Sequence, residues 1–114
     1  MNAEELMYKT LNSDEAPAFL AESFVNENEI PSKVWIYNNT HTENVRADDK
    51  IYAQEYEFCV AYYSDDPRNM REIVFNKCNE LEAAGFVCSG AYRIPNKYKP
   101  SFGLGFIATI QIKI

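Results

Sequence analysis

The sequence of 114 residues has little of what catalytic and metal sites are usually built from. It contains one histidine and three cysteines, Cys59, Cys78 and Cys88, with no C-x-x-C pair among them. An odd number of cysteines without a nearby histidine argues against both a disulfide framework and a zinc site. We therefore expect three reduced, buried thiols, as is usual for a cytoplasmic protein.

A basic run, a long apolar run and a signal-peptide pattern are also missing. The 11 Lys and Arg are scattered and outnumbered by 17 Asp and Glu, which gives a formal net charge of −6. Such a charge argues against a protein that binds nucleic acid by neutralising phosphates. No stretch approaches the roughly 20 apolar residues that cross a bilayer, and residues 1–6 have neither the basic nor the apolar region of a signal peptide. We expect a soluble protein that is made in the cytoplasm and does not enter a membrane.

What the sequence does contain is typical of one globular domain, which we place at residues 1–114. Hydrophobic residues make up 46% and charged residues 25%, and a chain of this length can bury a core without disulfides or metal. Aromatic residues reach 14%, with eight tyrosines and seven phenylalanines. This content fits two interpretations: tyrosine favours strands, and it is also common on half-buried surfaces and interfaces.

The clearest pattern lies in the last stretch, from Ser101 to Ile114. The residues at odd positions are mostly small or polar, and Ile107 is the one apolar residue among them. Every second residue is apolar, namely Phe102, Leu104, Phe106, Ala108, Ile110, Ile112 and Ile114. A period of two predicts a strand with one buried face and one exposed face. Another element must therefore cover the apolar face.

A helix predicted for residues 67–84 has the right shape to cover that face. Asp66 is a suitable N-cap and Pro67 a suitable first helical residue. Gly85 supplies the left-handed residue that commonly ends a helix. The apolar residues between them recur at a spacing of three to four, at Met70, Ile73 or Val74, Cys78, Leu81 and Ala84.

Further strands and short helices are predicted in the rest of the chain. Asn2 caps a first short helix, with Glu5 in capping-box register, and a second short helical stretch runs from Pro17 to about Asn26. Apolar patterns of strands occur at residues 33–38, 51–63 and 86–94. The predicted fold is α+β: a four-stranded, mainly antiparallel sheet with one long helix packed on one face and short N-terminal helices.

No combination of residues has the spacing of a catalytic, cofactor or metal site. His41 has no serine or cysteine partner at a telling separation in the sequence. Glu55 and Glu57 share one strand face without the apolar pocket that keeps a catalytic carboxylic acid protonated. Gly103 and Gly105 lie inside a strand and lack the helix and lysine that follow a phosphate loop. We predict no catalytic, cofactor-binding or metal-binding residues and no enzyme activity.

The remaining feature is a long polar stretch, residues 39–50, between two predicted strands. Loops of this length in compact domains are either functional or disordered, and both interpretations stay open here. If the stretch is functional, its polar and charged side chains are candidates for contacts with another protein. To these we add the one apolar residue on the polar face of the last strand. The candidate interface residues are Thr40, His41, Asn44, Arg46, Asp48, Asp49 and Ile107.

Five segments follow one another in an order that is also found in a family of phage proteins. They are the strand Lys33-Val-Trp-Ile-Tyr37, the strand Tyr56-Glu-Phe-Cys-Val-Ala-Tyr-Tyr-Ser64, the helix opening Asp65-Asp66-Pro67-Arg-Asn-Met-Arg-Glu72, the helix exit Leu81-Glu-Ala-Ala-Gly-Phe86, and a last hairpin that ends in alternating apolar residues. In this layout the chain resembles the tail terminator proteins of long-tailed bacteriophages, also called tail-completion or head–tail joining proteins. The resemblance covers most of the chain, and the residues before Glu29 depart from it.

The resemblance implies a structural virion protein at the head-proximal end of the tail, without catalytic residues. Members of this family form a hexameric ring that ends the tail tube and offers the surface to which the filled head attaches. The implied partners are other copies of the chain, the tail tube protein and the head-completion or connector protein. DNA passes through such a ring without specific binding, which is compatible with a net charge of −6. The alternative is a small cytoplasmic α+β module of the adaptor or immunity type, which binds another protein and has no catalytic activity.

Overall fold

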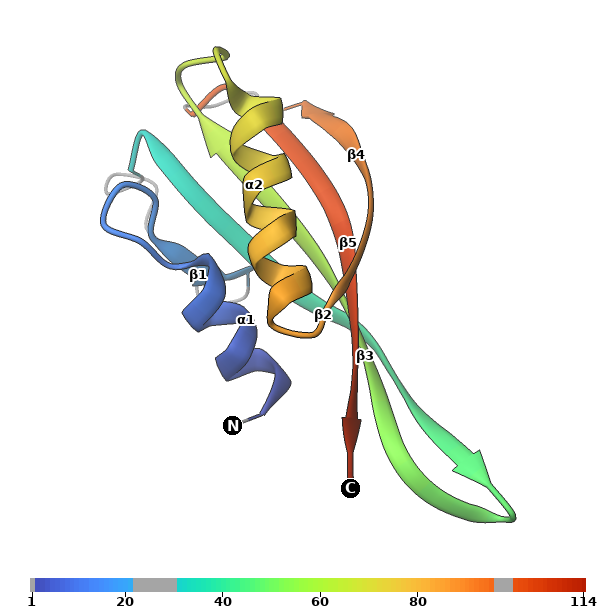
Figure 1. The fold of residues 1–114 in the computed structure, drawn as a ribbon. Helices are drawn as coiled ribbons and strands as arrows, with labels where there is room; N and C mark the ends of the chain where they lie inside the picture. Colours follow the sequence, from blue (N-terminus) through green and yellow to red (C-terminus); the bar gives the residue numbers. More distant parts are fainter. Residues whose placement is uncertain (1, 22–30, 96–99) are drawn as a thin grey trace.

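The computed structural model describes residues 2–21, 31–95 and 100–114, which have an α+β fold (Figure 1). Along the chain these residues form α1 (Ala3–Leu11), β1 (Ala18–Leu20), β2 (Lys33–Ala47), β3 (Lys50–Ser64), α2 (Met70–Ala83), β4 (Val87–Pro95) and β5 (Phe102–Lys113). The strands form one sheet in the order β1-β2-β3-β5-β4. β1 is parallel to β2, and the other neighbours are antiparallel. The α+β class is confirmed, whereas the prediction of a four-stranded sheet is wrong because β1 adds a parallel fifth strand at one edge.

The strand β1 replaces the second N-terminal helix that the sequence predicts. Its three residues pair with Trp35, Ile36 and Tyr37 of β2, and the Trp35 N–H donates a hydrogen bond to the Pro17 carbonyl at 2.9 Å. Three residues are too few to show a period of two, so the sequence pattern does not distinguish this strand from a helical turn. Pairing with β2 gives hydrogen-bond partners to the backbone of these residues, whereas a short helix is only marginally stable. Residues 22–26, where the predicted helix ended, lie outside the described residues.

The first helix, α1, forms where the sequence predicts it. The Asn2 side-chain oxygen accepts a hydrogen bond from the Glu5 N–H at 2.8 Å, and the Asn2 amide donates one to the Glu5 carboxylate at 3.0 Å. These two bonds are a variant of the capping box. Met7 and Leu11, one turn apart, are fully buried in the core. The apolar stripe therefore fixes this short helix to the sheet.

The long helix, α2, begins three residues later than predicted. Asp66 is not its N-cap, because its carboxylate accepts hydrogen bonds from the Arg68 backbone N–H at 3.0 Å and from the Arg68 guanidinium at 2.9 Å. The bond to the guanidinium is the main reason that the pKa of Asp66 is lowered to about 2. Asn69 takes the cap position with a left-handed φ of 62° and makes no capping bond through its side chain. An aspartate before a proline suits both a cap and a turn, and here it forms a turn.

Gly85 ends α2 as predicted, with a φ of 111°. The Phe86 N–H donates to the Leu81 carbonyl at 3.0 Å and the Gly85 N–H to the Glu82 carbonyl at 3.1 Å. These are the two hydrogen bonds of a Schellman motif. The motif turns the chain into β4 and places the Phe86 ring edge-on against Phe58, with 6.1 Å between ring centroids.

The core lies between the sheet and the two helices, which cover the same face of the sheet (Figure 1). Its centre is aromatic, because Trp35 of β2 packs against Tyr62 of β3 and Phe106 of β5. The ring centroids are 4.6 Å apart in the first pair and 6.5 Å apart in the second. Aromatic pairs of this kind add about 0.5–1.5 kcal/mol beyond the area that they bury. The three central strands are thereby joined under the helices.

The alternation predicted for the last strand is confirmed over its central part. The even-numbered residues of β5 from Leu104 to Ile110 are at most 6% exposed. Phe102, at the start of the strand, and Ile114, directly after its end, are 43% and 77% exposed, because the strand is longer than the helices that cover it. β5 pairs with β3 on one side and β4 on the other, so it lies at the centre of the antiparallel part of the sheet.

The three cysteines are free thiols, but they are half-buried and not fully buried as predicted. Cys78 of α2 and Cys88 of β4 meet between helix and sheet, where the Cys88 sulfur lies 4.0 Å from the Cys78 carbonyl oxygen. The two thiols also share a hydrogen bond, which lowers the pKa of Cys78 and raises that of Cys88. This contact links the end of α2 to the start of β4.

The polar stretch 39–50 continues two strands and does not form a loop. β2 runs on to Ala47 and β3 starts at Lys50, so only Asp48 and Asp49 connect them. The loop prediction is wrong because the side chains of this stretch are almost all polar. A strand that is exposed on both faces has no hydrophobic period by which to recognise it.

Candidate interaction site

The most prominent surface feature is the outer part of the β2–β3 hairpin, residues 40–57, which we call the arm. It reaches beyond both helices and beyond β4 (Figure 1), and the molecule measures 50 Å along its longest axis. β5 follows the arm as a third strand up to the pair Ala53–Lys113. Residues 40–44 and 46–52 are all exposed, so the outer end of the arm presents two uncovered faces. Ala53 is buried and residues 54–57 are half-buried.

A β-bulge at Thr40 separates the arm from the covered part of the sheet. Before it, Asn39 pairs with Phe58, and after it, His41 pairs with Glu57, so Thr40 has no partner residue. One extra residue reverses which face each later side chain of β2 occupies. The Thr40 hydroxyl donates to a Glu57 carboxylate oxygen at 3.0 Å. The bulge therefore moves the odd-numbered residues of β2 from the helix-covered face to the open face.

The open face of the arm is acidic. His41 lies opposite Glu57, and Glu43 lies directly opposite Glu55. The His41 Nε2 is 2.9 Å from a Glu43 carboxylate oxygen, and this hydrogen bond is the main reason that the pKa of His41 is raised. The Gln111 amide donates to Glu55 at 3.2 Å. One histidine and one amide thus face three carboxylates. The opposition of Glu43 and Glu55 is unfavourable, because like charges directly opposite each other in a sheet are destabilising.

On the other face of the arm, Asn44 and Gln54 form a pair of amides. Gln54 donates to Asn44 across the strand pair at 3.2 Å, and the Tyr56 hydroxyl donates to Gln54 at 2.8 Å. Ile110 and Ile112 of β5 pair with Tyr56 and Gln54, respectively. The arm therefore offers one acidic face and one face of amides with aromatic and aliphatic neighbours.

The arm ends in a two-residue turn made of Asp48 and Asp49. Their φ angles are 51° and 64°, which is the left-handed backbone of a type I′ hairpin turn. Such turns favour Asn-Gly, because a side chain in this region carries a steric cost. Both aspartates are exposed, and neither forms an ion pair with another residue in the described part of the chain. Arg46 and Lys50 flank the turn and are also exposed.

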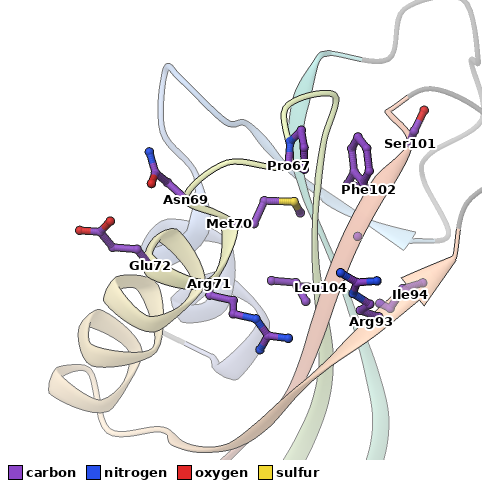
Figure 2. A pocket seen from close by; sticks show the side chains of 11 residues that line it. Pro67, Asn69, Met70, Arg71, Glu72, Arg93, Ile94, Ser101, Phe102 and Leu104 are labelled. Carbon is purple, nitrogen blue, oxygen red and sulfur yellow. The ribbon is translucent and has the colours of Figure 1, made fainter.

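A cavity of about 630 Å³ lies at the opposite end of the molecule, between the start of α2 and the strands β4 and β5 (Figure 2). Its volume is in the range of about 300–1,000 Å³ that is usual for ligand pockets. Arg71 from α2 and Arg93 from β4 line it, together with the apolar side chains of Met70, Phe102 and Leu104. Neither arginine makes an ion pair within residues 2–21, 31–95 and 100–114.

Ile107 lies on the open face of the sheet, outside the arm. It is half-buried and pairs with Cys59 on one side and Ser89 on the other. The neighbouring positions Gly103 and Gly105 are not bare, as the sequence suggested, but buried.

Aromatic and aliphatic side chains from the adjacent strands explain that burial. A Cβ atom built on Gly103 would meet the Tyr63 ring, and one built on Gly105 would meet Ile94 and Tyr92. The absence of a side chain at each glycine is thus what allows these three neighbours to lie across β5. The open face is consequently more apolar than the sequence of β5 alone indicates.

The structure brings six of the seven candidate interface residues together and leaves one apart. Thr40, His41, Asn44, Arg46, Asp48 and Asp49 all belong to the arm, whereas Ile107 does not. The sequence reasoning missed the cavity arginines, because Arg71 and Arg93 are separated by 21 residues and no motif connects them.

No group of His, Cys, Asp or Glu residues suited to hold a metal ion occurs among the described residues. Within the same residues, neither helix is long and apolar enough to cross a membrane.

No protein-family model matches the chain, and no curated protein sequence matches it. Three surface features of the described residues bear on function: the arm, the aspartate turn and the arginine-lined cavity.

Proposed function

We propose that the protein is a structural virion protein of a long-tailed bacteriophage, which caps the tail tube as a ring and joins the tail to the head. It is made in the host cytoplasm and becomes part of the virion at the head-proximal end of the tail. The proposal combines the resemblance in segment order with an α+β body that carries a projecting arm. Its partners are other copies of the chain, the tail tube protein and the connector.

The arm is the observation that carries this proposal. Ordering each backbone residue costs about 1–2 kcal/mol of conformational entropy, and the outer end of the arm, where residues 40–44 and 46–52 are exposed, buries little to offset it. The direct opposition of Glu43 and Glu55 adds repulsion. A structure that lowers the stability of the isolated chain is expected where another subunit or protein contacts it. A subunit of an assembly has such contacts and a free monomeric enzyme does not.

The charge of the chain supports the same proposal. A ring around passing DNA must not bind phosphates tightly, because each neutralised phosphate strengthens non-specific binding. With 17 acidic and 11 basic residues, the chain repels DNA overall. DNA is accordingly a molecule that passes through the ring and not a ligand.

Negative-stain electron microscopy of the purified protein, alone and mixed with polymerising tail tube protein of the same phage, tests this function. We expect rings in the first sample and tubes of reduced length, capped at one end, in the second. A monomer that leaves tube growth unchanged would contradict the proposal. Such a monomer would instead favour the adaptor or immunity-type module.

A further inference from the structure

We infer that the aspartate turn of the arm docks into the arginine-lined cavity of a second copy of the chain. This inference rests on the proposed function, because it names the contact between ring subunits. It starts from two groups of charged residues on one molecule that lack ion-pair partners among the described residues. Asp48 and Asp49 form an acidic tip, and Arg71 and Arg93 form a basic cavity, with no ion pair to either set from the described residues.

The cavity has the composition of a site for an anionic protein segment. Arg71 and Arg93 line it from two different elements, α2 and β4 (Figure 2). Guanidinium groups bind carboxylates through paired hydrogen bonds. Met70 and Leu104, 6% and 5% exposed, form its apolar wall, with the half-exposed ring of Phe102 beside them.

The tip of the arm is opposite in charge to the arginines of this cavity. It is narrow, because two residues close the hairpin, and its carboxylates are flanked by Arg46 and Lys50. Glu72 also lines the cavity and provides an acidic partner for one of these flanking cations. Ile51, 37% exposed beside the turn, supplies an apolar side chain for the apolar wall.

The choice of residues in the turn points to a role for the carboxylates. Asn-Gly would form the same type I′ turn with less strain and without charge repulsion. Asp48 and Asp49 instead hold two adjacent negative charges in the left-handed region. Strained backbone of this kind is retained mainly where it serves a function.

The tip cannot reach the cavity of its own chain. β3 runs from Lys50 at the tip to Ser64, which pairs with Phe102 at the cavity. Fourteen residue steps of a strand span about 45 Å, so the two sites lie at opposite ends of the molecule. Docking therefore joins two copies head to tail. A head-to-tail contact produces a closed ring when the rotation between subunits closes, and an open filament when it does not.

Complementary charge reversals test this contact by light scattering. Asp48→Arg/Asp49→Arg destroys the tip and leaves the cavity, and Arg71→Glu/Arg93→Glu does the opposite. We expect each variant to remain folded by circular dichroism and to associate at least about tenfold more weakly than the wild type. An equimolar mixture should assemble again, because every contact in it can join opposite charges. The control Asp14→Arg/Glu15→Arg makes the same change in charge at two exposed residues outside the arm, and it should assemble normally.

The variant Asp48→Asn/Asp49→Gly separates the charges from the shape of the turn. It keeps the type I′ turn and relieves its strain, so we expect a more stable monomer that nevertheless assembles poorly. Raising the salt concentration should weaken wild-type assembly in the same way, because exposed ion pairs are screened.

Three results would overturn the inference, and they separate it from the proposed function. If both charge-reversed variants form rings like the wild type, this contact is wrong while the ring proposal stands. If the variants are monomeric and their mixture stays monomeric, the pairing of tip and cavity is wrong. If the wild type and the mixture are monomeric at every concentration and the wild type also leaves tube growth unchanged, both proposals are contradicted.

Discussion

The Lys77 ammonium of α2 donates a hydrogen bond to the Thr10 carbonyl oxygen of α1 at 3.0 Å. That carbonyl belongs to the last turn of α1, where backbone acceptors lack helical partners and the helix dipole favours a cation. The same ammonium lies 2.7 Å from a Glu80 carboxylate oxygen and 5.8 Å from the Trp35 ring centroid. With its side chain only 13% exposed, Lys77 joins the two helices directly above the aromatic centre of the core.

Replacing Lys77 should therefore destabilise the fold. We expect Lys77→Ala to lower the free energy of unfolding by about 1.5–3 kcal/mol, the usual cost of losing a hydrogen bond to a charged group. Glu80→Gln is the matched control, because it removes only the exposed ion pair and should cost under about 1 kcal/mol. Urea unfolding followed by tryptophan fluorescence measures both, since Trp35 is the only tryptophan. Equal effects of the two substitutions would show that the Thr10 contact contributes nothing.

The turn at the tip of the arm should become more stable when its residues suit its backbone. Asp48→Asn/Asp49→Gly removes a side chain from one left-handed position and the repulsion between two carboxylates. A residue with a side chain costs about 1–2 kcal/mol in the left-handed region. We therefore expect the free energy of unfolding of the monomer to rise by about 1 kcal/mol. Thermal and urea unfolding in dilute solution would check this. An unchanged or lower stability would mean that the turn is not of type I′.

The single histidine allows one pKa to be measured without interference. The pKa of His41 is raised above 6.5, first by its hydrogen bond with Glu43 and further by the charges of Glu57 and Glu55. Protonated His41 is therefore favoured by the folded arm. Its stabilising effect is complete below pH 6.5 and is lost as the pH rises through the raised value.

Nuclear magnetic resonance titration of the imidazole protons should give a His41 pKa above 6.5. Glu43→Gln should bring it back towards 6.5, while Asp14→Asn, an exposed acidic residue outside the arm, should leave it unchanged. A wild-type value at or below 6.5 would contradict the acidic face described here.

The two glycines of β5 should differ in how well they tolerate alanine. A Cβ on Gly103 would lie 2.8 Å from the Tyr63 ring and 2.9 Å from the Ile94 backbone oxygen. A Cβ on Gly105 would lie 2.6 Å from the terminal methyl group of Ile94, which can rotate away. Overpacking costs about 1–3 kcal/mol, so we expect Gly103→Ala near the upper end and Gly105→Ala near the lower end. Urea unfolding of the two variants side by side provides the comparison, and the reverse order would contradict the packing on the open face.

Sequence patterns predicted those parts of the fold in which one side of an element is buried. The alternation through Leu104 and Phe106, the cap at Asn2 and the stop at Gly85 each have a local physical cause. β1 was missed because its three residues carry no period and its partner lies elsewhere in the chain. The arm was missed because exposed strands have polar residues on both faces, and a single extra residue at Thr40 changes the register.

The candidate site was predictable only in part for a related reason. Charged residues such as Asp48 and Asp49 stood out because they lie in one continuous polar stretch. Arg71 and Arg93 come together only through the packing of α2 against β4 and β5, which no local pattern encodes. Ile107 stood out in the sequence of β5, but it lies away from the arm, among Cys59 and Ser89 on the neighbouring strands.

The mass of the wild-type particle in solution tests the central claim most directly. Size-exclusion chromatography with multi-angle light scattering would measure it over a wide range of protein concentrations. A closed ring predicts one discrete mass that is a whole multiple of the 13.1 kDa chain, and a hexamer predicts six times that value. A mass of 13.1 kDa at every concentration would contradict the account.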